Sequence, residues 1–303
     1  MTVKLETLSA DKSGIARAAA LLRAGDLVAF PTETVYGLGA DARNASAVAA
    51  IFEAKGRPTF NPLIVHVADI EAAQRLAVWS PTADRLARAF WPGPLTLVLP
   101  LAQDHGLSSL VTAGLGTVGL RVPGSDTARA VLEAFDGPIA APSANPSGRI
   151  SPTTAAHVAA GLAGEIAAVL DGGACAVGLE STIVGLDGDT QHLLRAGGVP
   201  REALEAALGA PLAEPRSEEI TAPGQLASHY APQARVRLNA EGPVGDEVFL
   251  GFGPGAQADL NLSDAGDLRE AAARLFECLH ALDALARPIA VAPVPDIGLG
   301  AAI

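Results

Sequence analysis

Basic and hydroxyl side chains that could bind a polyanionic ligand gather between residues 30 and 67. An apolar run at 27–30 stops at Pro31, and a segment of small and hydroxyl residues follows it: Thr32, Thr34, Tyr36, Gly37 and Gly39. A helical segment then ends in Lys55-Gly56-Arg57-Pro58, before the apolar run 63–67. Cations and hydroxyl groups between two strands are suited to a phosphate-bearing ligand.

The position of Lys55 in the sequence has two interpretations. The chain holds only three lysines, and the other two, Lys4 and Lys12, lie in the polar N-terminal segment. A lysine inside a patterned region is therefore a candidate phosphate ligand. The alternative is a cation at a helix C-terminus, favoured by the helix dipole and by Gly56 as the cap. Position alone favours this structural alternative.

Several common catalytic and metal-binding patterns are missing from the chain. There is no GxxxxGK[ST] phosphate loop, GLGADA (37–42) is an incomplete GxGxxG, and Ser143 is not in a GxSxG turn. The two cysteines are far apart, and the six histidines show no metal-ligand spacing. We expect neither a protein-bound metal nor a covalent nucleophile.

Polar residues recur where predicted strands begin or end. Ligands of open α/β sheets collect outside the carboxyl ends of strands, so these residues are candidates for one site. Each also has a structural explanation. Turns are satisfied by hydroxyl and amide side chains, His66 could be a hydrogen-bonded core histidine, and Arg121 or Arg195 could form structural ion pairs. The candidates are Thr32, Thr34, Tyr36, Lys55, Arg57, His66, Arg121, Ser143, Asn145, Ser147, Ser151, Ser181, Thr182 and Arg195.

Alternating strand and helix patterns predict an α/β protein whose late strands make the sheet mixed. Helices are expected at 13–25, 45–55, 69–77, 82–90, 126–135, 153–161 and 200–208. Strands are expected at 27–30, 62–67, 95–99, 118–122, 138–141, 167–170, 182–186 and 192–195, with a loop at 101–116.

Composition changes at Gly209, where a segment with four prolines and no regular period runs to residue 235. A long linker of this kind is usually functional. A second α/β pattern follows, with strands at 235–239, 247–252 and 288–292 and a helix around 266–286. We therefore predict a large α/β domain at 1–208 that carries the candidate site, a linker at 209–235 and a small α/β domain at 236–303.

Charge and hydropathy argue against a membrane protein and against a nonspecific nucleic-acid-binding protein. No apolar run approaches the ~20 residues of a membrane-spanning helix, and the start lacks the apolar core of a signal peptide. The net charge of −12 argues against stable, nonspecific nucleic-acid binding. We expect a cytoplasmic protein that does not bind membranes.

Read as strings, the candidate segments carry a family resemblance. PTETVYGLG, KxRPxxNPLIVHV, WPGPLTLVL, GLRVP, APSANPSGRxSPT, GLESTIV and LLRAGGV follow one another in this order. Over residues 12–208 the chain resembles the YrdC-like threonylcarbamoyl-AMP synthase family. SHYAPQAR (228–235) and the small domain resemble its two-domain form. The resemblance implies a twisted, mixed, open sheet with flanking helices, joined by the long linker to a small Rossmann-like domain.

The resemblance also implies an activity. The family joins L-threonine, bicarbonate or CO2, and ATP into L-threonylcarbamoyladenylate, with release of pyrophosphate. A downstream threonylcarbamoyl transferase complex uses this product to modify the adenosine beside the tRNA anticodon. The enzyme would thus be a nucleotidyltransferase, with Mg2+ brought by the ATP phosphates.

Matching the motifs residue by residue implies two groups of contacts. Lys55 and Arg57 would be catalytic, Arg121 would bind the threonine carboxylate, and Tyr230 would cover bound ATP from the linker. The implied ATP contacts are Lys55, Arg57, Asn61, Thr117, Ser143, Ser151, Arg195 and Tyr230. The implied threonine contacts are Thr34, His66, Arg121, Ala141 and Ser181.

The sequence leaves three alternative functions open. The chain could be a carbamoyl-adenylate-forming module like that of hydrogenase-maturation carbamoyltransferases, although those carry zinc-finger-like cysteine motifs. It could be an RNA-binding module that uses the same concave site, which the net charge of −12 disfavours. Residues 236–303 could also be a regulatory domain.

Overall fold

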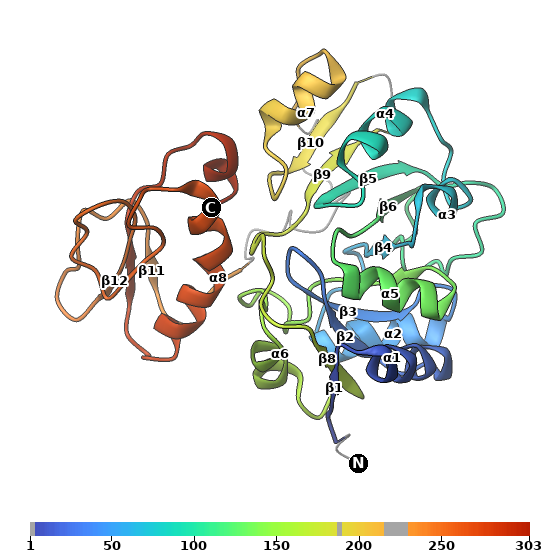
Figure 1. Ribbon diagram of the computed structural model, residues 1–303, viewed down its shortest axis with the longest axis horizontal. Helices are drawn as coiled ribbons and strands as arrows, with labels where there is room; N and C mark the ends of the chain where they lie inside the picture. The colour runs from blue at the N-terminus through green and yellow to red at the C-terminus, as the bar shows by residue number, and fades with distance from the viewer. Residues whose placement is uncertain (1–3, 187–189, 215–229) are drawn as a thin grey trace.

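A computed structural model describes residues 4–186, 190–214 and 230–303. These residues form a ten-stranded sheet and, later in the chain, a separate four-stranded sheet (Figure 1). In spatial order the large sheet contains β1 (Glu6–Ser9), β8 (Ala168–Asp171), β2 (Val28–Pro31), β3 (Tyr36–Asp41), β7 (Ile139–Ala140), β4 (Ile64–His66), β6 (Thr117–Arg121), β5 (Leu95–Pro100), β9 (Thr182–Gly185) and β10 (His192–Arg195).

The large sheet is mixed, as the sequence predicted. Strand β4 runs parallel to β6 and β5 runs parallel to β9, whereas β2 and β3 form an antiparallel hairpin. Side chains alternate between two cores: Val28 and Phe30 belong to one, and Ala29 between them belongs to the other. The sheet is therefore covered on both faces.

In the part of the chain that the structure describes, seven helices flank the large sheet, and side-chain or glycine caps mark the ends of most of them. The side chains of Asp11, Asn44 and Thr154 accept hydrogen bonds from the first turns of α1, α2 and α6. Gly56 ends α2 with a φ of 57°. The helices are α1 (Lys12–Ala24), α2 (Ala45–Lys55), α3 (Ile70–Gln74), α4 (Pro81–Phe90), α5 (Asp126–Phe135), α6 (Ala155–Leu162) and α7 (Arg201–Leu208).

Strand β3 was not predicted. The sequence suggested an irregular segment of small and hydroxyl residues after Pro31, but 36–41 pairs with β2 and β7. Gly39 is required there because a Cβ at this position would lie 2.7 Å from the Phe30 ring. Strand β1 and the short strand β13 were not predicted either.

The small domain is built on a parallel sheet of β11 (Val236–Arg237), β14 (Ile289–Val291), β12 (Val248–Gly251) and β13 (Leu260–Asn261). Helix α8 (Leu268–Asp283) and a 3-10 helix, η1 (Gly298–Ala302), complete it. Gly178 lies directly against α8, since a Cβ there would be 2.5 Å from Ala273 Cα. The small domain thus touches the segment that leads to β9.

Most of the predicted linker, 215–229, lies outside the described residues. Its two described ends both contact the large domain: Ala213 bridges to His192 on β10, and Ala231 bridges to Arg149. In the described parts of the chain, no helix is long and apolar enough to cross a membrane.

Candidate active site

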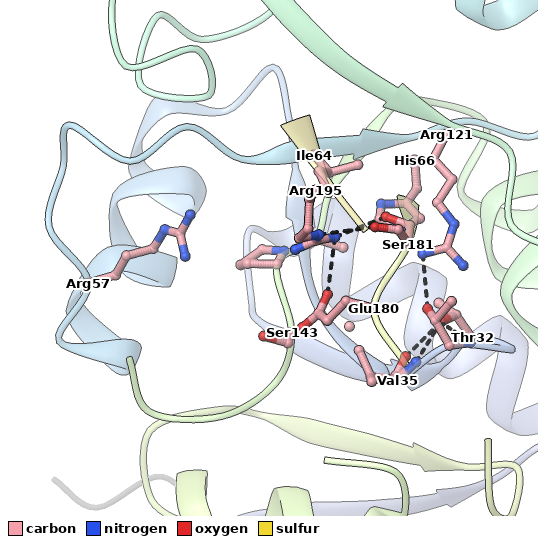
Figure 2. A pocket seen from close by; sticks show the side chains of 14 residues that line it. Thr32, Val35, Arg57, Ile64, His66, Arg121, Ser143, Glu180, Ser181 and Arg195 are labelled. Carbon is pink, nitrogen blue, oxygen red and sulfur yellow. Dashed lines mark hydrogen bonds and ion pairs between the residues drawn. The ribbon is translucent and has the colours of Figure 1, made fainter. Parts of the chain in front are cut away.

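A pocket opens where the β2–β3 turn, β4, β6, the segment after β7 and the segment before β9 converge (Figure 2). It brings together many of the residues singled out in the sequence. Those that line it are Thr32, Thr34, Arg57, His66, Arg121, Ala141, Ser143, Ser181 and Arg195. The lining does not include Lys55, Asn61, Thr117, Ser151 or Tyr230.

Arg121 is the last residue of β6, and its buried guanidinium donates three hydrogen bonds within the described residues. Nε donates to Gly93 O at 3.2 Å, and Nη1 donates to Thr34 Oγ1 at 3.0 Å. Nη2 donates to Glu33 Oε1 at 2.6 Å. A guanidinium has five N–H donors, and these three bonds are the ones that Arg121 makes within the described residues, which leaves two N–H groups for a ligand such as a carboxylate.

Glu33 was not predicted to belong to the site. Its Oε2 also accepts a hydrogen bond from Ser125 N at 3.2 Å, so it ties the β2–β3 turn to both β6 and α5. Burial alone would raise its pKa, but the attraction and hydrogen bond of Arg121 outweigh burial and hold the pKa below 4.5. Glu33 is therefore an ionised carboxylate that orients Arg121.

His66 stands beside Arg121, because β4 and β6 pair these two residues in register. Burial, reinforced by the charge of Arg121, lowers the pKa of His66 to about 3. The imidazole is neutral at physiological pH, and its Nδ1 has no hydrogen-bond partner among the described residues. A polar group of a bound ligand would satisfy it.

Lys55 is the last residue of α2, and its side chain crosses to the segment after β7. Nζ donates to Ser143 O at 2.5 Å and also to Asn145 O. Burial, followed by repulsion from Arg57, lowers the pKa of Lys55 to about 7. Lys55 is thus both the end of a helix and a buried cation directly behind pocket-lining Ser143.

Arg57 and Asn61 lie on the turn that follows α2. Arg57 Nη2 donates to Pro62 O at 2.8 Å, and burial lowers the pKa of Arg57 to about 10. Asn61 is fully buried, and within the described parts of the chain neither its Nδ2 nor its Oδ1 has a hydrogen-bond partner. An unsatisfied buried amide next to a cation indicates a place for a polar ligand.

Arg195 ends β10 and reaches over the segment before β9. Nε and Nη2 donate to Ser181 O and Oγ at 3.0 and 3.1 Å, and Nη1 donates to Tyr230 Oη at 3.4 Å. Glu180, also missed from sequence, accepts a hydrogen bond from Ser151 Oγ at 2.9 Å. Tyr230 and Ser151 therefore adjoin the pocket through Arg195 and Glu180.

The arrangement has two halves. Arg121, His66 and Thr34 can hold a small zwitterion by its carboxylate and polar groups. Lys55, Arg57 and Arg195 supply positive charge on the other side, suited to phosphates. Among the described residues there is no cluster of three or more His, Cys, Asp or Glu side chains that could hold a metal ion.

Comparisons with known proteins agree with the two-part architecture. A family model described as Telomere recombination (Sua5, YciO, YrdC) matches residues 20–197. A second, described as Threonylcarbamoyl-AMP synthase, C-terminal domain, matches residues 199–303.

The curated relatives include proteins named Threonylcarbamoyl-AMP synthase. That of Bacillus subtilis is 49% identical over 239 residues, covering 77% of this chain and 68% of the relative. That of Pyrococcus abyssi is 42% identical over 310 residues, covering 94% of this chain and 90% of the relative.

Solved structures also show similarity to this family. The crystal structure of P. abyssi Sua5 complexed with L-threonine superposes with a TM-score of 0.89 at 40% identity, covering 98% of this chain and 94% of that one. Escherichia coli YciO, at 22% identity and a TM-score of 0.58 over 64% of this chain, shares the fold.

Proposed function

Because the chain belongs to the two-domain threonylcarbamoyl-AMP synthase family, we propose that its pocket makes L-threonylcarbamoyladenylate from L-threonine, bicarbonate or CO2, and ATP. Pyrophosphate is the second product. The adenylate then serves threonylcarbamoyladenosine formation beside the tRNA anticodon, through a downstream transferase complex. The observation that carries the proposal is Arg121, a buried guanidinium with two N–H groups to spare beside a cluster of cations.

Threonine would bind at the Arg121 side. Its carboxylate takes the two remaining N–H groups, and neutral His66 offers a hydrogen bond to a polar group of the amino acid. Thr34, Ala141 and Ser181 form the walls. A neutral imidazole suits this place, because a charged one would be buried beside the positive charge of Arg121.

ATP would bind on the side of Arg57, Ser143 and Arg195, with Lys55 holding the segment that carries Ser143. Asn61, Thr117, Ser151 and Tyr230 complete the proposed contacts. The amine of threonine becomes a carbamate, and a carbamate oxygen attacks the α-phosphorus. This chemistry needs no covalent intermediate with the enzyme, so positioning and charge stabilisation supply the catalysis.

Mg2+ fits this donor set as a companion of ATP. Mg2+ is commonly bound through substrate phosphates, waters and one or two carboxylates, and Glu180 is a carboxylate at the pocket. When bound, the ion neutralises charge on the phosphates. The chain's own part is to hold the triphosphate with Arg57 and Arg195.

Pyrophosphate release from ATP, with each of threonine, bicarbonate and Mg2+ omitted in turn, tests the proposal. We expect release to require all of them, and serine or carbamoyl phosphate not to replace threonine. Formation of an AMP adduct with carbamoyl phosphate in place of threonine would instead assign the carbamoyl-adenylate activity. ATP turnover that ignores threonine would contradict the proposal.

Tyr230 provides a prediction about ATP. Its hydroxyl meets Arg195, and its ring centroid lies 5.6 Å from that of Phe276 on α8. We expect Tyr230→Ala to weaken ATP binding about tenfold and threonine binding less than about twofold, since a ring contact and a hydrogen bond are lost on the nucleotide side. Isothermal titration with each ligand measures both.

Tyr230→Phe separates the two contributions, because it keeps the ring and removes only the hydroxyl. Equal weakening of both ligands by Tyr230→Ala would contradict a nucleotide-side role.

A further inference from the structure

Among the described residues that line the pocket, Glu180 is the one with an acidic side chain (Figure 2). It precedes Ser181 in the chain, at the boundary between the two proposed half-sites. A carboxylate repels a polyphosphate unless a cation such as Mg2+ lies between them. Its contacts within the protein give it a second role.

The two carboxylate oxygens of Glu180 contact two different segments. Oε1 accepts the hydrogen bond from Ser151 Oγ, and Oε2 lies 3.5 Å from Arg195 Nη2. The side chains of Arg195 and Glu180 are only 9% and 13% exposed. Solvent and salt therefore screen this pair weakly, and loss of the carboxylate would release both neighbours.

Arg195 extends the network to the amino-acid side. It donates to both oxygens of Ser181, whose Oγ lies 2.7 Å from Thr96 Oγ1. Ser181 and Thr96 are fully buried. The chain of contacts from Ser151 through Glu180 and Arg195 to Ser181 thus joins a proposed ATP contact to a proposed threonine contact.

The charge of Glu180 also offsets crowding among the cations. Burial and Arg57 lower the pKa of Lys55, and Glu180 acts in the opposite direction. It has the same opposing effect on the pKa of Arg57, which burial lowers. The carboxylate therefore helps to keep three like charges together before a phosphate arrives.

We propose that Glu180 is a positioning residue that links ATP binding to threonine binding by fixing Arg195 between the two half-sites. Arg195 is hydrogen-bonded to Ser181 and paired with Glu180, so a shift of Ser181 when one ligand binds also repositions the guanidinium that would meet the phosphates. The first ligand bears the cost of this shift, so the second binds more tightly, which is positive coupling. This inference rests on the proposed function.

Titration of L-threonine with and without saturating α,β-methylene ATP and Mg2+ measures the coupling, since this analogue resists cleavage at the α–β bond. For the unmodified protein we expect the analogue to tighten threonine binding at least about fivefold. In Glu180→Gln we expect a ratio below about twofold, with the Kd for threonine alone changed less than about threefold.

Glu247→Gln is a matched control. Glu247 is also an arginine-paired carboxylate whose side chain is 13% exposed, but it lies in the small domain and pairs with Arg237. This variant should keep the full coupling ratio. If Glu180 acts through Arg195, Glu180→Gln should also change the ratio no further in an Arg195→Met background.

The coupling proposal is wrong if the unmodified protein shows a ratio of one, or if Glu180→Gln keeps the unmodified ratio. It is also wrong if Glu180→Gln alters only the Mg2+ dependence of analogue binding, which would assign the carboxylate to the metal. Should Glu180→Gln fail to fold, Glu180→Asp keeps the charge on a shorter side chain, and a reduced ratio is again expected. Failure of the proposed function would appear separately, as no threonine-dependent pyrophosphate release.

Discussion

Replacing Lys55 with methionine is expected to lower kcat/KM for ATP on the order of 10²–10³-fold while the protein remains folded. The ammonium group holds Ser143 O and Asn145 O and places a positive charge behind the proposed phosphate site. Methionine keeps the length of the buried side chain but cannot donate to either carbonyl oxygen. Pyrophosphate release and far-ultraviolet circular dichroism measure the two parts of the prediction.

The pH dependence of ATP binding provides a second readout of Lys55. Its pKa of about 7 in the empty site means that the cation is lost as pH rises above this value. Bound phosphates favour the protonated form, so the Kd for ATP should rise by up to about tenfold per pH unit above pH 7. Lys55→Met should remove this slope.

The stability of the protein should respond to the same residue. Because the pKa of Lys55 is lowered from 10.5 on folding, the unfolded chain binds more protons between about pH 7 and 10.5. The free energy of unfolding attributable to Lys55 therefore increases with pH across this window, and Lys55→Met should lack the increase. Lys12→Met, at an exposed lysine that begins α1, is the control. Unchanged pyrophosphate release by Lys55→Met would refute its proposed role.

Local sequence signals predicted much of the site's framework. Alternating apolar residues and turn-forming residues indicate where a strand ends, and a strand end fixes the side of the sheet on which a residue lies. His66, Arg121 and Arg195 were identified in this way, and all three line one pocket. The mixed α/β fold was predicted for the same reason and is confirmed.

Local sequence signals could not predict side-chain contacts between segments that lie far apart in the chain. Glu33 meets Arg121 across 88 positions, and Glu180 meets Ser151 across 29, although each glutamate lies inside a motif that was quoted. A helix-ending lysine also does not reveal that its ammonium reaches Ser143, again 88 positions away. Side-chain direction at the end of an element depends on what packs there, which only the folded chain determines.

The contact between the two domains was also not predictable from the sequence. His280 of α8 stacks on His157 with ring centroids 3.9 Å apart, and its Nε2 lies 3.1 Å from Ser151 O. Neither histidine was a candidate in the sequence, because single histidines without metal spacing carry no signal of their own. The contact nevertheless joins the small domain to a proposed ATP contact.

Arg121→Met is expected to raise the KM for threonine on the order of 10²-fold, as a buried charge-assisted contact to the carboxylate is lost. Binding of α,β-methylene ATP should change less than about threefold, because Arg121 lies on the amino-acid side of the pocket. Steady-state kinetics and calorimetric titration measure these effects. Arg88→Met removes an exposed arginine of α4 and should change neither. An equal loss of both ligands in Arg121→Met would contradict the division of the site.

Loss of Arg121 should also reverse the pH response of Glu33. In the unmodified protein the lowered pKa of Glu33 adds stability above pH 4.5, which is lost as pH falls through the folded-state pKa. Without Arg121, burial dominates and raises that pKa, so the contribution of Glu33 is present at low pH and is lost as pH rises. The deficit in Tm of Arg121→Met should therefore be larger at neutral than at acidic pH. Adding Glu33→Gln should remove this difference and recover stability, because no buried charge is then unpaired; a deficit that is independent of pH would show that Glu33 does not depend on Arg121.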